Sequence, residues 1–335
     1  MADELIVVGG GAAGMMAAIS AAETGAAVRL LERNPKVGRK LYITGKGRCN
    51  VTNHCPPEEV LASTPRNGRF LYGAVTRTPP AWVEDFFTGL GVPLKVERGN
   101  RVFPVSDHSS DVIAALAREM QHLKVKVQLH CEVKELLINN EKEIKGVRLA
   151  NGKKMTADAV VVATGGISYP STGSTGDGYR FARNCGHKVT ELFPSLVPME
   201  VKEWYAKELQ GLSLKNIEIH ITDGKKKLYD EFGEMLFTHY GVTGPVILSA
   251  SSIVGKTLEK KELVLHIDLK PAPRRNISDF RVRFAIKKSF ALQAYHSNNY
   301  KLLWMILKRT KAPQILSGDI VAMTFIGKLV SVFVT

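Results

Sequence analysis

The stretch ELIVVGGGAAGMMAAISAAETGAAVRLLE, residues 4–32, determines the fold class. Residues 4–8 are mostly apolar and β-branched, as in a buried parallel strand. Glycines come directly after them, and an alanine-rich segment then runs to Gly25, which is typical of a helix that ends in a glycine cap. Residues 27–32 form the next predicted strand. Strand, glycine turn, helix and strand within about 30 residues make a βαβ unit and predict an α/β fold.

The glycines of this turn are spaced Gly9-x-Gly11-x-x-Gly14 between the predicted strand and the predicted helix. Gly9 permits the tight turn, Gly11 lets the backbone approach a pyrophosphate, and Gly14 allows the helix to pack closely on the strand. The first turn of the helix offers free N–H groups and a positive dipole end to phosphates. An ordinary glycine-rich turn remains the alternative, but the strand–turn–helix context favours a dinucleotide site.

Glu32 closes the second predicted strand, 18 residues after Gly14. A carboxylate at this place accepts hydrogen bonds from a ribose diol, and its charge repels a 2′-phosphate. We therefore expect that this site does not take NADP.

The choice between FAD and NAD rests on two segments near residue 165. The second glycine cluster, residues 165–178, does not repeat the fingerprint spacing, so a second nucleotide domain is not expected. The predicted strand 157–164 ends in Ala163-Thr164-Gly165-Gly166, which is the pattern by which FAD enzymes return the chain to the same nucleotide. The pattern favours FAD at this site, with NAD as the alternative.

The composition is that of a globular protein of about two domains, with 335 residues, 44% hydrophobic and 23% charged. No apolar run reaches the ~18 residues of a membrane-spanning helix. Asp3 and Glu4 stand where a signal peptide would be basic. The four cysteines show neither CxxC nor zinc spacing, which predicts reduced thiols and no metal site. We therefore expect a cytoplasmic protein without a membrane partner.

The net charge of +14 raises nucleic-acid binding as an alternative function. Residues 281–335, however, contain nine lysines and arginines and one acidic residue, Asp319, so most of the excess belongs to this tail. No recognisable nucleic-acid module accompanies the charge. The sequence thus predicts a small-molecule substrate and no nucleic-acid partner, and leaves the oligomeric state open.

Five segments carry a family resemblance. They are residues 7–53 with GRK (38–40) and GKGRCN (45–50), GNRVFPVSDHSSDV (99–112), ATGGISYPSTGSTGDGYRFARNCGH (163–187), PSLVPMEV (194–201) and GEMLFTHYGVTGPVILSAS (233–251). With them the chain resembles the BaiN/YhiN-type bacterial FAD-dependent oxidoreductases, also known as aminoacetone-oxidase-like flavoproteins. The resemblance implies a doubly wound Rossmann-type FAD-binding domain with an inserted, mainly β domain.

The resemblance also implies where the cofactor lies. Ala13 would contact the pyrophosphate, Arg39 and Lys40 would flank the FAD with the 45–50 loop, and Val133 would meet the adenine through its backbone. The cations of this loop suit a dianionic pyrophosphate, although a solvated basic loop remains the alternative. The cofactor-binding residues that we predict are Gly9, Gly11, Ala13, Gly14, Glu32, Arg33, Arg39, Lys40, Gly47, Arg48, Asn50, Val133, Thr164 and Gly165.

The character of the chain changes after residue 190, where short alternating segments such as 217–222 and 263–269 begin. We predict an FAD-binding domain over 1–190, an inserted, mainly β domain over 191–275, and an atypical basic C-terminal tail over 276–335. Members of the resembled family end in a segment that covers the flavin. Because the tail lacks that segment, we expect a truncation, a frameshift or a divergent substitute after about residue 280.

No catalytic residue is assigned by the sequence. His239 and Tyr240 could protonate a substrate, although such a pair more often packs within its own loop, and Cys49 has no second cysteine at redox spacing. Asp177 is expected to cap the helix directly after it. The predicted function is FAD-dependent oxidoreduction with hydride from NAD(P)H or an organic substrate, an enone being one option for the acceptor. The alternative is a non-catalytic flavoprotein remnant.

Overall fold

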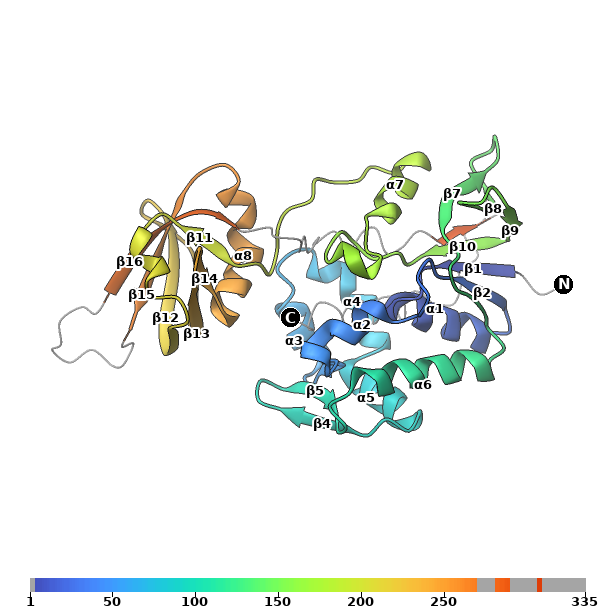
Figure 1. Ribbon diagram of the computed structural model, residues 1–335, viewed down its shortest axis with the longest axis horizontal. Coiled ribbons are helices and arrows are strands. Elements are labelled where there is room, and N and C mark those ends of the chain that lie inside the picture. The colour runs from blue at the N-terminus through green and yellow to red at the C-terminus, as the bar shows by residue number, and fades with distance from the viewer. Residues whose placement is uncertain (1–3, 270–280, 290–305, 309–335) are drawn as a thin grey trace. The chain divides into compact units, whose positions relative to one another are not determined.

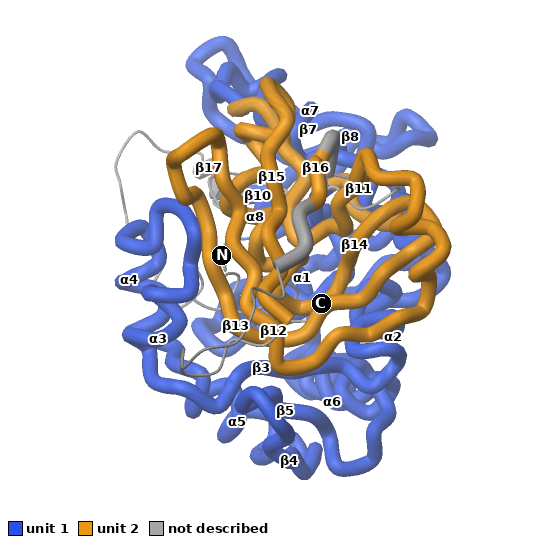
Figure 2. Tube along the Cα trace, turned by 90° about the vertical axis from the view of Figure 1, so that its left-hand side faces the viewer, with its two compact units in different colours: residues 1–166, 170–189, 300–335 blue, residues 167–169, 190–299 orange. Residues whose placement is uncertain are grey.

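The computed structural model describes residues 4–269, 281–289 and 306–308, which belong to two compact units (Figures 1 and 2). The first unit holds residues up to 166, residues 170–189 and the last part of the chain from 300. The second unit holds residues 167–169 and 190–299.

The first unit is built on a five-stranded sheet of order β17-β10-β1-β2-β6. Four strands run parallel: β1 (Glu4–Val8), β2 (Ala27–Leu31), β6 (Lys126–Gln128) and β10 (Ala159–Val162). The edge strand β17 (Ile306–Lys308) pairs antiparallel with β10. In this order β1 lies between β10 and β2, and β2 is the strand that follows the predicted helix in the chain. The βαβ unit predicted from residues 4–32 is therefore confirmed.

Side chains of β1 alternate between the two faces of the sheet. Leu5 and Val7 pack into a core with helix α1 (Ala12–Glu23) and helix α6 (Ser109–His122). Ile6 and Val8 pack into a second core, which contains residues of α7 (Asp177–Asn184) and of an antiparallel three-stranded sheet. That sheet consists of β7 (Val133–Ile138), β8 (Ile144–Leu149) and β9 (Lys154–Thr156). The α/β fold class is confirmed, with helices on one face and mainly strands on the other.

The segment between β2 and α6 carries smaller elements. Residues 33–55 contain the short helix α2 (Arg39–Ile43), a 3-10 turn (Thr44–Gly47) and β3 (Thr52–Asn53). Helices α3 (Pro57–Ala62), α4 (Gly68–Arg77) and α5 (Pro80–Gly89) come next, and β3 pairs with a hairpin of β4 (Leu94–Glu97) and β5 (Arg101–Pro104). Figure 1 shows these elements in order along the chain.

The second unit is a closed barrel of order β11-β14-β13-β12-β15-β16. Its strands are β11 (Met199–Val201), β12 (Ser213–Asp223), β13 (Lys226–Thr238), β14 (Gly241–Thr243), β15 (Leu263–Asp268) and β16 (Arg281–Ser289). Inward residues of β12 and β15, such as Ile219 and Leu265, form one core with helix α8 (Pro245–Leu258). The alternation in the sequence therefore points correctly to strands, but it gives no sign of α8.

The stretch 276–335, which the sequence predicts to be an atypical tail, contributes a strand to each unit. Its residues 281–289 are the barrel strand β16, and residues 306–308 are β17 of the first unit. The rest of the stretch, including the place of the expected truncation or frameshift, lies outside the described residues.

Gly14 permits the close approach of α1 to the turn after β1. A Cβ atom at Gly14 would lie 1.8 Å from the carbonyl oxygen of Gly9, which is backbone and cannot move aside. Gly14→Ala is therefore expected to destabilise the protein by about 1–3 kcal/mol through overpacking.

Urea denaturation monitored by circular dichroism measures this loss. Gly73→Ala is the matched control, because Gly73 lies within α4 and a Cβ there meets nothing within 4 Å. That change should be neutral or stabilising by up to about 1 kcal/mol. Equal stability of the Gly14→Ala variant and the parent protein would contradict the close approach.

Candidate functional site

The glycine turn at the N-terminus of α1 leaves open space for a ligand. Gly9 has φ +107°, a conformation that favours glycine, and a Cβ there would lie 2.6 Å from Ala163 O. Gly11 is the N-cap of α1 with extended backbone, and a Cβ atom on it would meet nothing within 4 Å. The N–H groups of the first helical turn have no acceptor inside the helix. The turn can therefore receive an anionic group at its open side.

The end of β10 lies directly beside this turn. The N–H of Ala163 donates to Val8 O at 2.8 Å, and Gly9 packs against the backbone of residues 163 and 164. Thr164 Oγ1 is buried and forms no hydrogen bond within the part of the chain that the structure describes. A buried hydroxyl without a partner is costly, so a ligand that supplies one would be favoured here.

Glu32 is 7% exposed and its carboxylate is held in place by backbone and side-chain donors. Oε2 accepts from the N–H of Gly10 at 2.6 Å. Oε1 accepts from Asn34 twice, from the backbone N–H at 2.8 Å and from Nδ2 at 2.7 Å. Each carboxylate oxygen has more than one lone pair, so these bonds leave acceptor capacity for a ribose. The ribose contact itself stays a prediction.

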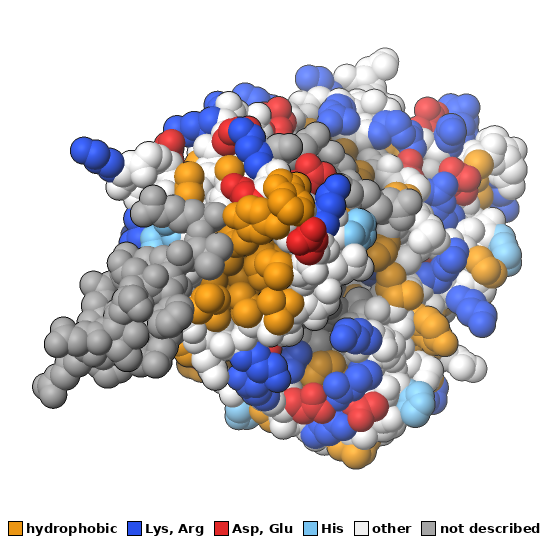
Figure 3. All heavy atoms as spheres, turned by 60° about the vertical axis from the view of Figure 1, so that its left-hand side comes forward, with side chains coloured by type: hydrophobic (Ala, Val, Ile, Leu, Met, Phe, Trp, Pro, Cys, Tyr) orange, Lys and Arg blue, Asp and Glu red, His pale blue; other side chains and the backbone are white. Residues whose placement is uncertain are grey.

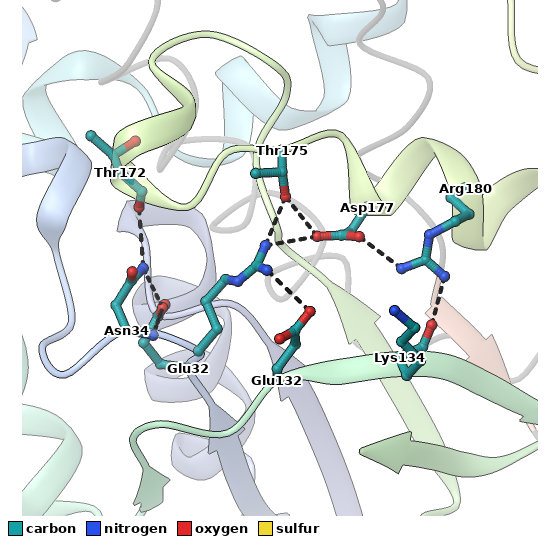
Figure 4. Close-up of polar contacts among 9 residues, drawn as sticks. Glu32, Asn34, Glu132, Lys134, Thr172, Thr175, Asp177 and Arg180 are labelled. Atoms are coloured by element: carbon teal, nitrogen blue, oxygen red, sulfur yellow. Dashed lines mark hydrogen bonds and ion pairs between the residues drawn. The ribbon is translucent and has the colours of Figure 1, made fainter. Parts of the chain in front are cut away.

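Arg33, also predicted to bind the cofactor, is bound to other residues of the protein. Nη1 donates to Thr175 Oγ1 at 2.7 Å and to Asp177 Oδ2 at 3.0 Å, and Nη2 donates to Glu132 Oε1 at 3.1 Å. Figure 4 shows these partners in two segments of the chain, Glu132 in one and Thr175 and Asp177 in the other. Asp177 is the first residue of α7 rather than its N-cap, which is Gly176, and no side chain caps this helix.

The segment 39–50 lies against the same turn through Gly38, whose N–H donates to Gly10 O at 2.7 Å. Arg39 Nη1 donates to Asn34 Oδ1 at 2.8 Å. Burial lowers the pKa of Lys40 to about 8. A lysine with such a pKa is mostly charged at pH 7 and loses its charge as the pH rises through about 8, and a nearby diphosphate would favour its charged form.

Arg48, in the same segment, has two carboxylates as partners. Its Nε donates to Asp107 Oδ1 at 2.7 Å, it forms an ion pair with Glu97, and its guanidinium lies 4.1 Å from the centroid of the Phe103 ring. Hydrogen bonds from Lys95 and Arg48 hold the pKa of Asp107 below its usual value. A role of Arg48 in cofactor binding stays a prediction, and these bonds anchor the segment.

Four further predicted residues lie at three places. Asn50 is buried and Gly47 has φ +89° with open space around its Cα. Val133, 6% exposed, begins β7 close to Glu32, since the N–H of Cys131 donates to Glu32 O at 2.8 Å. Gly165 has φ +73°, and a Cβ there would lie 2.9 Å from Ser174 Oγ.

Asn34, which connects Glu32 with the segment after β10, is not among the residues predicted from the sequence. Its Nδ2 donates both to Glu32 Oε1 and to Thr172 O, the latter at 3.2 Å. The only feature of the sequence that points to this role is the position of Asn34, an amide side chain two residues after Glu32, the acidic residue of the fingerprint.

Cys49 is fully buried, and burial raises its thiol pKa to about 11, so it is protonated near neutral pH.

His239 and Tyr240 belong to the second unit, in the turn between β13 and β14. Their rings pack edge to face at 4.6 Å, and Tyr240 O accepts from the N–H of Val201. In the same unit Trp204 is 70% exposed. Figure 3 shows hydrophobic side chains gathered between charged ones on the face that it presents. The proton-donor role of the pair stays a prediction.

Metal binding and membrane insertion find no support among the described residues. In residues 4–269, 281–289 and 306–308, no group of three or more His, Cys, Asp or Glu side chains could hold a metal ion. Within the same ranges, none of the helices has the length and apolar character that crossing a bilayer requires.

Known proteins are similar to this chain in sequence and in fold. The model of the HI0933-like protein Rossmann domain matches residues 3–264. The 3-dehydro-bile acid delta(4,6)-reductase of Clostridium scindens is 33% identical over 272 residues, which cover 79% of this chain and 64% of the reductase. The ribosomal RNA dihydrouridine synthase of Haemophilus influenzae is 30% identical over 251 residues, covering 74% of this chain and 61% of the synthase. The chain thus spans less than two thirds of these relatives.

Two solved structures have a similar fold. A flavocytochrome c3 fumarate reductase in its open conformation has a TM-score of 0.50 at 19% identity, covering 79% of this chain and 52% of that chain. The 3-ketosteroid delta1-dehydrogenase of Sterolibacterium denitrificans also has a TM-score of 0.50, at 15% identity, covering 79% of this chain and 69% of that chain. At such identities the likeness establishes the fold alone.

The open space at Gly11 gives a test of the phosphate site. Gly11→Val should abolish FAD binding and leave the fold intact, because the new side chain meets only the space that a pyrophosphate needs. Flavin absorbance of the purified variant measures the bound FAD. Gly89→Val is the control, since a Cβ there also meets nothing within 4 Å. Unchanged flavin content in the Gly11→Val variant would place the cofactor elsewhere.

The lowered pKa of Lys40 predicts a pH dependence of FAD affinity. Lys40 loses its charge as the pH rises through about 8, and with it the attraction to a diphosphate. Between about pH 7 and about pH 9 the affinity should fall by roughly three- to tenfold. Quenching of flavin fluorescence measures this.

Lys40→Arg, which keeps its charge over this range, should bind FAD with a flat pH profile, and Lys40→Met should bind it weakly and with a flat profile. The same slope in all three proteins would show that Lys40 lies away from the phosphates.

Proposed function

The chain belongs to the HI0933-like Rossmann-domain family, and from this we propose that it acts as an FAD-dependent oxidoreductase that reduces a carbon–carbon double bond conjugated with a carbonyl group. Family membership confirms the resemblance drawn from the sequence, the Rossmann-type fold and FAD as the cofactor. The observation that carries the proposal is the open glycine turn at Gly11, with Glu32 and the end of β10 beside it.

The reaction class is supported by the names of the relatives. A delta(4,6)-reductase of a 3-dehydro-bile acid reduces double bonds near a ketone, and making dihydrouridine reduces the double bond of a uracil ring. A fumarate reductase reduces an alkene between two carboxylates. In all three the double bond is conjugated with a carbonyl or carboxyl group. That group activates the double bond, because its oxygen accepts the electron density that an incoming hydride brings. An enone is therefore our proposed acceptor.

The residues of the chain fit the cofactor in a defined order. The N–H groups at the start of α1 would bind the pyrophosphate, Glu32 would bind the ribose, and Thr164 Oγ1 would find a partner in the bound molecule. When bound, FAD supplies two-electron hydride chemistry between a reductant and the substrate. One hydride and one proton add across the double bond, and NAD(P)H as the proposed donor becomes NAD(P)⁺.

The wider setting is also a proposal. We propose a small-molecule substrate and a cytoplasmic location, the latter because the four cysteines are free thiols. The sequence predicts no nucleic-acid partner, and this stays a prediction. The relative named ribosomal RNA dihydrouridine synthase acts on an RNA, so an RNA substrate remains the alternative.

Anaerobic turnover tests the proposal. The chain loaded with FAD is mixed with NADH or NADPH and a 3-oxo-4-ene steroid, and oxidation of the nicotinamide is monitored by absorbance. We expect oxidation that depends on the steroid, and none with the matched saturated 3-oxo steroid. The Gly11→Val variant should lack this activity. Fumarate and a uridine-containing RNA fragment are then tested as further acceptors in the same assay.

The outcomes separate the proposed function from its alternative. Turnover with an activated alkene supports the oxidoreductase. Tightly bound FAD without turnover on any of these acceptors would instead favour the non-catalytic flavoprotein. Failure to bind FAD would contradict both.

A further inference from the structure

Arg33 stands directly after Glu32, whose carboxylate we predict to bind the ribose, and forms a polar bridge between distant segments. Its partners Glu132 and Asp177 lie 99 and 144 residues further along the chain. The first precedes β7, and the second begins α7. One guanidinium thus joins the end of β2, the start of β7 and the start of α7 (Figure 4).

Asp177 is itself held by a second arginine. Arg180 Nη2 donates to Asp177 Oδ1 at 2.7 Å, and its Nη1 donates to Lys134 O at 2.6 Å. Burial alone would raise the pKa of Asp177, but hydrogen bonds from Arg180 and Thr175 and the charge of Arg33 outweigh it, so the pKa is lowered. The Asp177 carboxylate is therefore charged near neutral pH and binds Arg33 as an anion.

Asn34 fastens the other end of the same segment. It donates to Thr172 O and to the Glu32 carboxylate through one nitrogen. Gly173 fits against it only because it has no side chain, since a Cβ there would lie 2.6 Å from Asn34 Nδ2. Residues 172–177 are thus bound at Thr172 by Asn34 and at Asp177 by Arg33, the two residues after Glu32.

We propose that Arg33 is a positioning residue that holds residues 172–177 against Asn34 and thereby fixes the Glu32 carboxylate for the ribose of the cofactor. Arg33 acts through Asp177 and Glu132 and does not contact a phosphate. Its charge is already matched by two carboxylates, and a phosphate contact would require breaking those bonds. A carboxylate held in its binding orientation loses less freedom when the ligand binds. The inference rests on the proposed FAD site and assigns a role within it.

The ribose hydroxyl provides the test, because a positioning residue and a phosphate ligand affect it differently. ADP and 2′-deoxy-ADP are titrated by calorimetry against the parent chain and Arg33→Met. In the parent, loss of the hydroxyl should weaken binding about tenfold, as one charge-assisted hydrogen bond is lost. In Arg33→Met, ADP should bind about tenfold more weakly, and the difference between the two ligands should shrink to less than about threefold.

Three more variants complete the experiment. Asp177→Asn should reduce the difference between the ligands as Arg33→Met does, because it removes the anion through which Arg33 acts. Arg33→Lys should restore it only in part, since one ammonium cannot reproduce the forked contacts of a guanidinium. Arg148→Met is the matched control, because it removes an arginine that pairs with Glu135 in the same unit. It should leave both affinities unchanged. Thermal unfolding verifies that each variant is folded.

The results that overturn the inference are distinct from those that overturn the proposed function. If Arg33→Met weakens ADP while the full difference between the ligands remains, Arg33 is a phosphate ligand. If the parent binds both ligands equally, Glu32 is not at the ribose and the inference fails, although FAD can still bind at the turn. If the parent binds neither ADP nor FAD, the site itself is wrong and both proposals fail.

Discussion

The close approach of α1 to the turn after β1 is the constraint on which the first unit depends. A hydrogen atom is the only side chain that fits between Gly14 and the carbonyl of Gly9, and Gly9 in turn leaves no space beside Ala163. The helix can therefore start directly above the sheet, with its first N–H groups at the carboxyl ends of β1 and β10. Parallel α/β sheets bind ligands at this edge. The same glycines thus allow the close packing and leave the open turn at which we propose that the pyrophosphate binds.

Charge around this turn is organised in pairs rather than as one basic patch. Arg33, Arg48 and Arg180 each bind carboxylates of the protein, and Arg39 binds the amide of Asn34. Several arginines that a sequence would assign to a dianionic cofactor therefore connect loops to one another. Lys40 differs from them, since burial lowers its pKa to about 8. A nearby anion would favour its charged form.

The division into two units reflects how each buries its apolar residues. Among the described residues of the first unit, two cores lie on opposite faces of one sheet, and a smaller apolar cluster joins α3 and α4. The second unit has one core inside a closed barrel, with α8 as part of it. The family match ends at residue 264, within β15, while the barrel is closed by β16 at residues 281–289.

The sequence by itself determined the βαβ unit, the glycine turn, the strand character of segments such as 217–222 and 263–269, and the FAD family. These features are encoded within short windows, because a turn that needs positive φ selects glycine and a buried strand selects apolar residues. Only the tertiary structure decided the partners of Arg33 and Arg48, the role of Asn34 and the place of residues 281–289 in the barrel. Those contacts join segments up to 144 residues apart. The residues next to a charged side chain in the sequence do not identify its partner, because distant segments are brought together only when the chain folds.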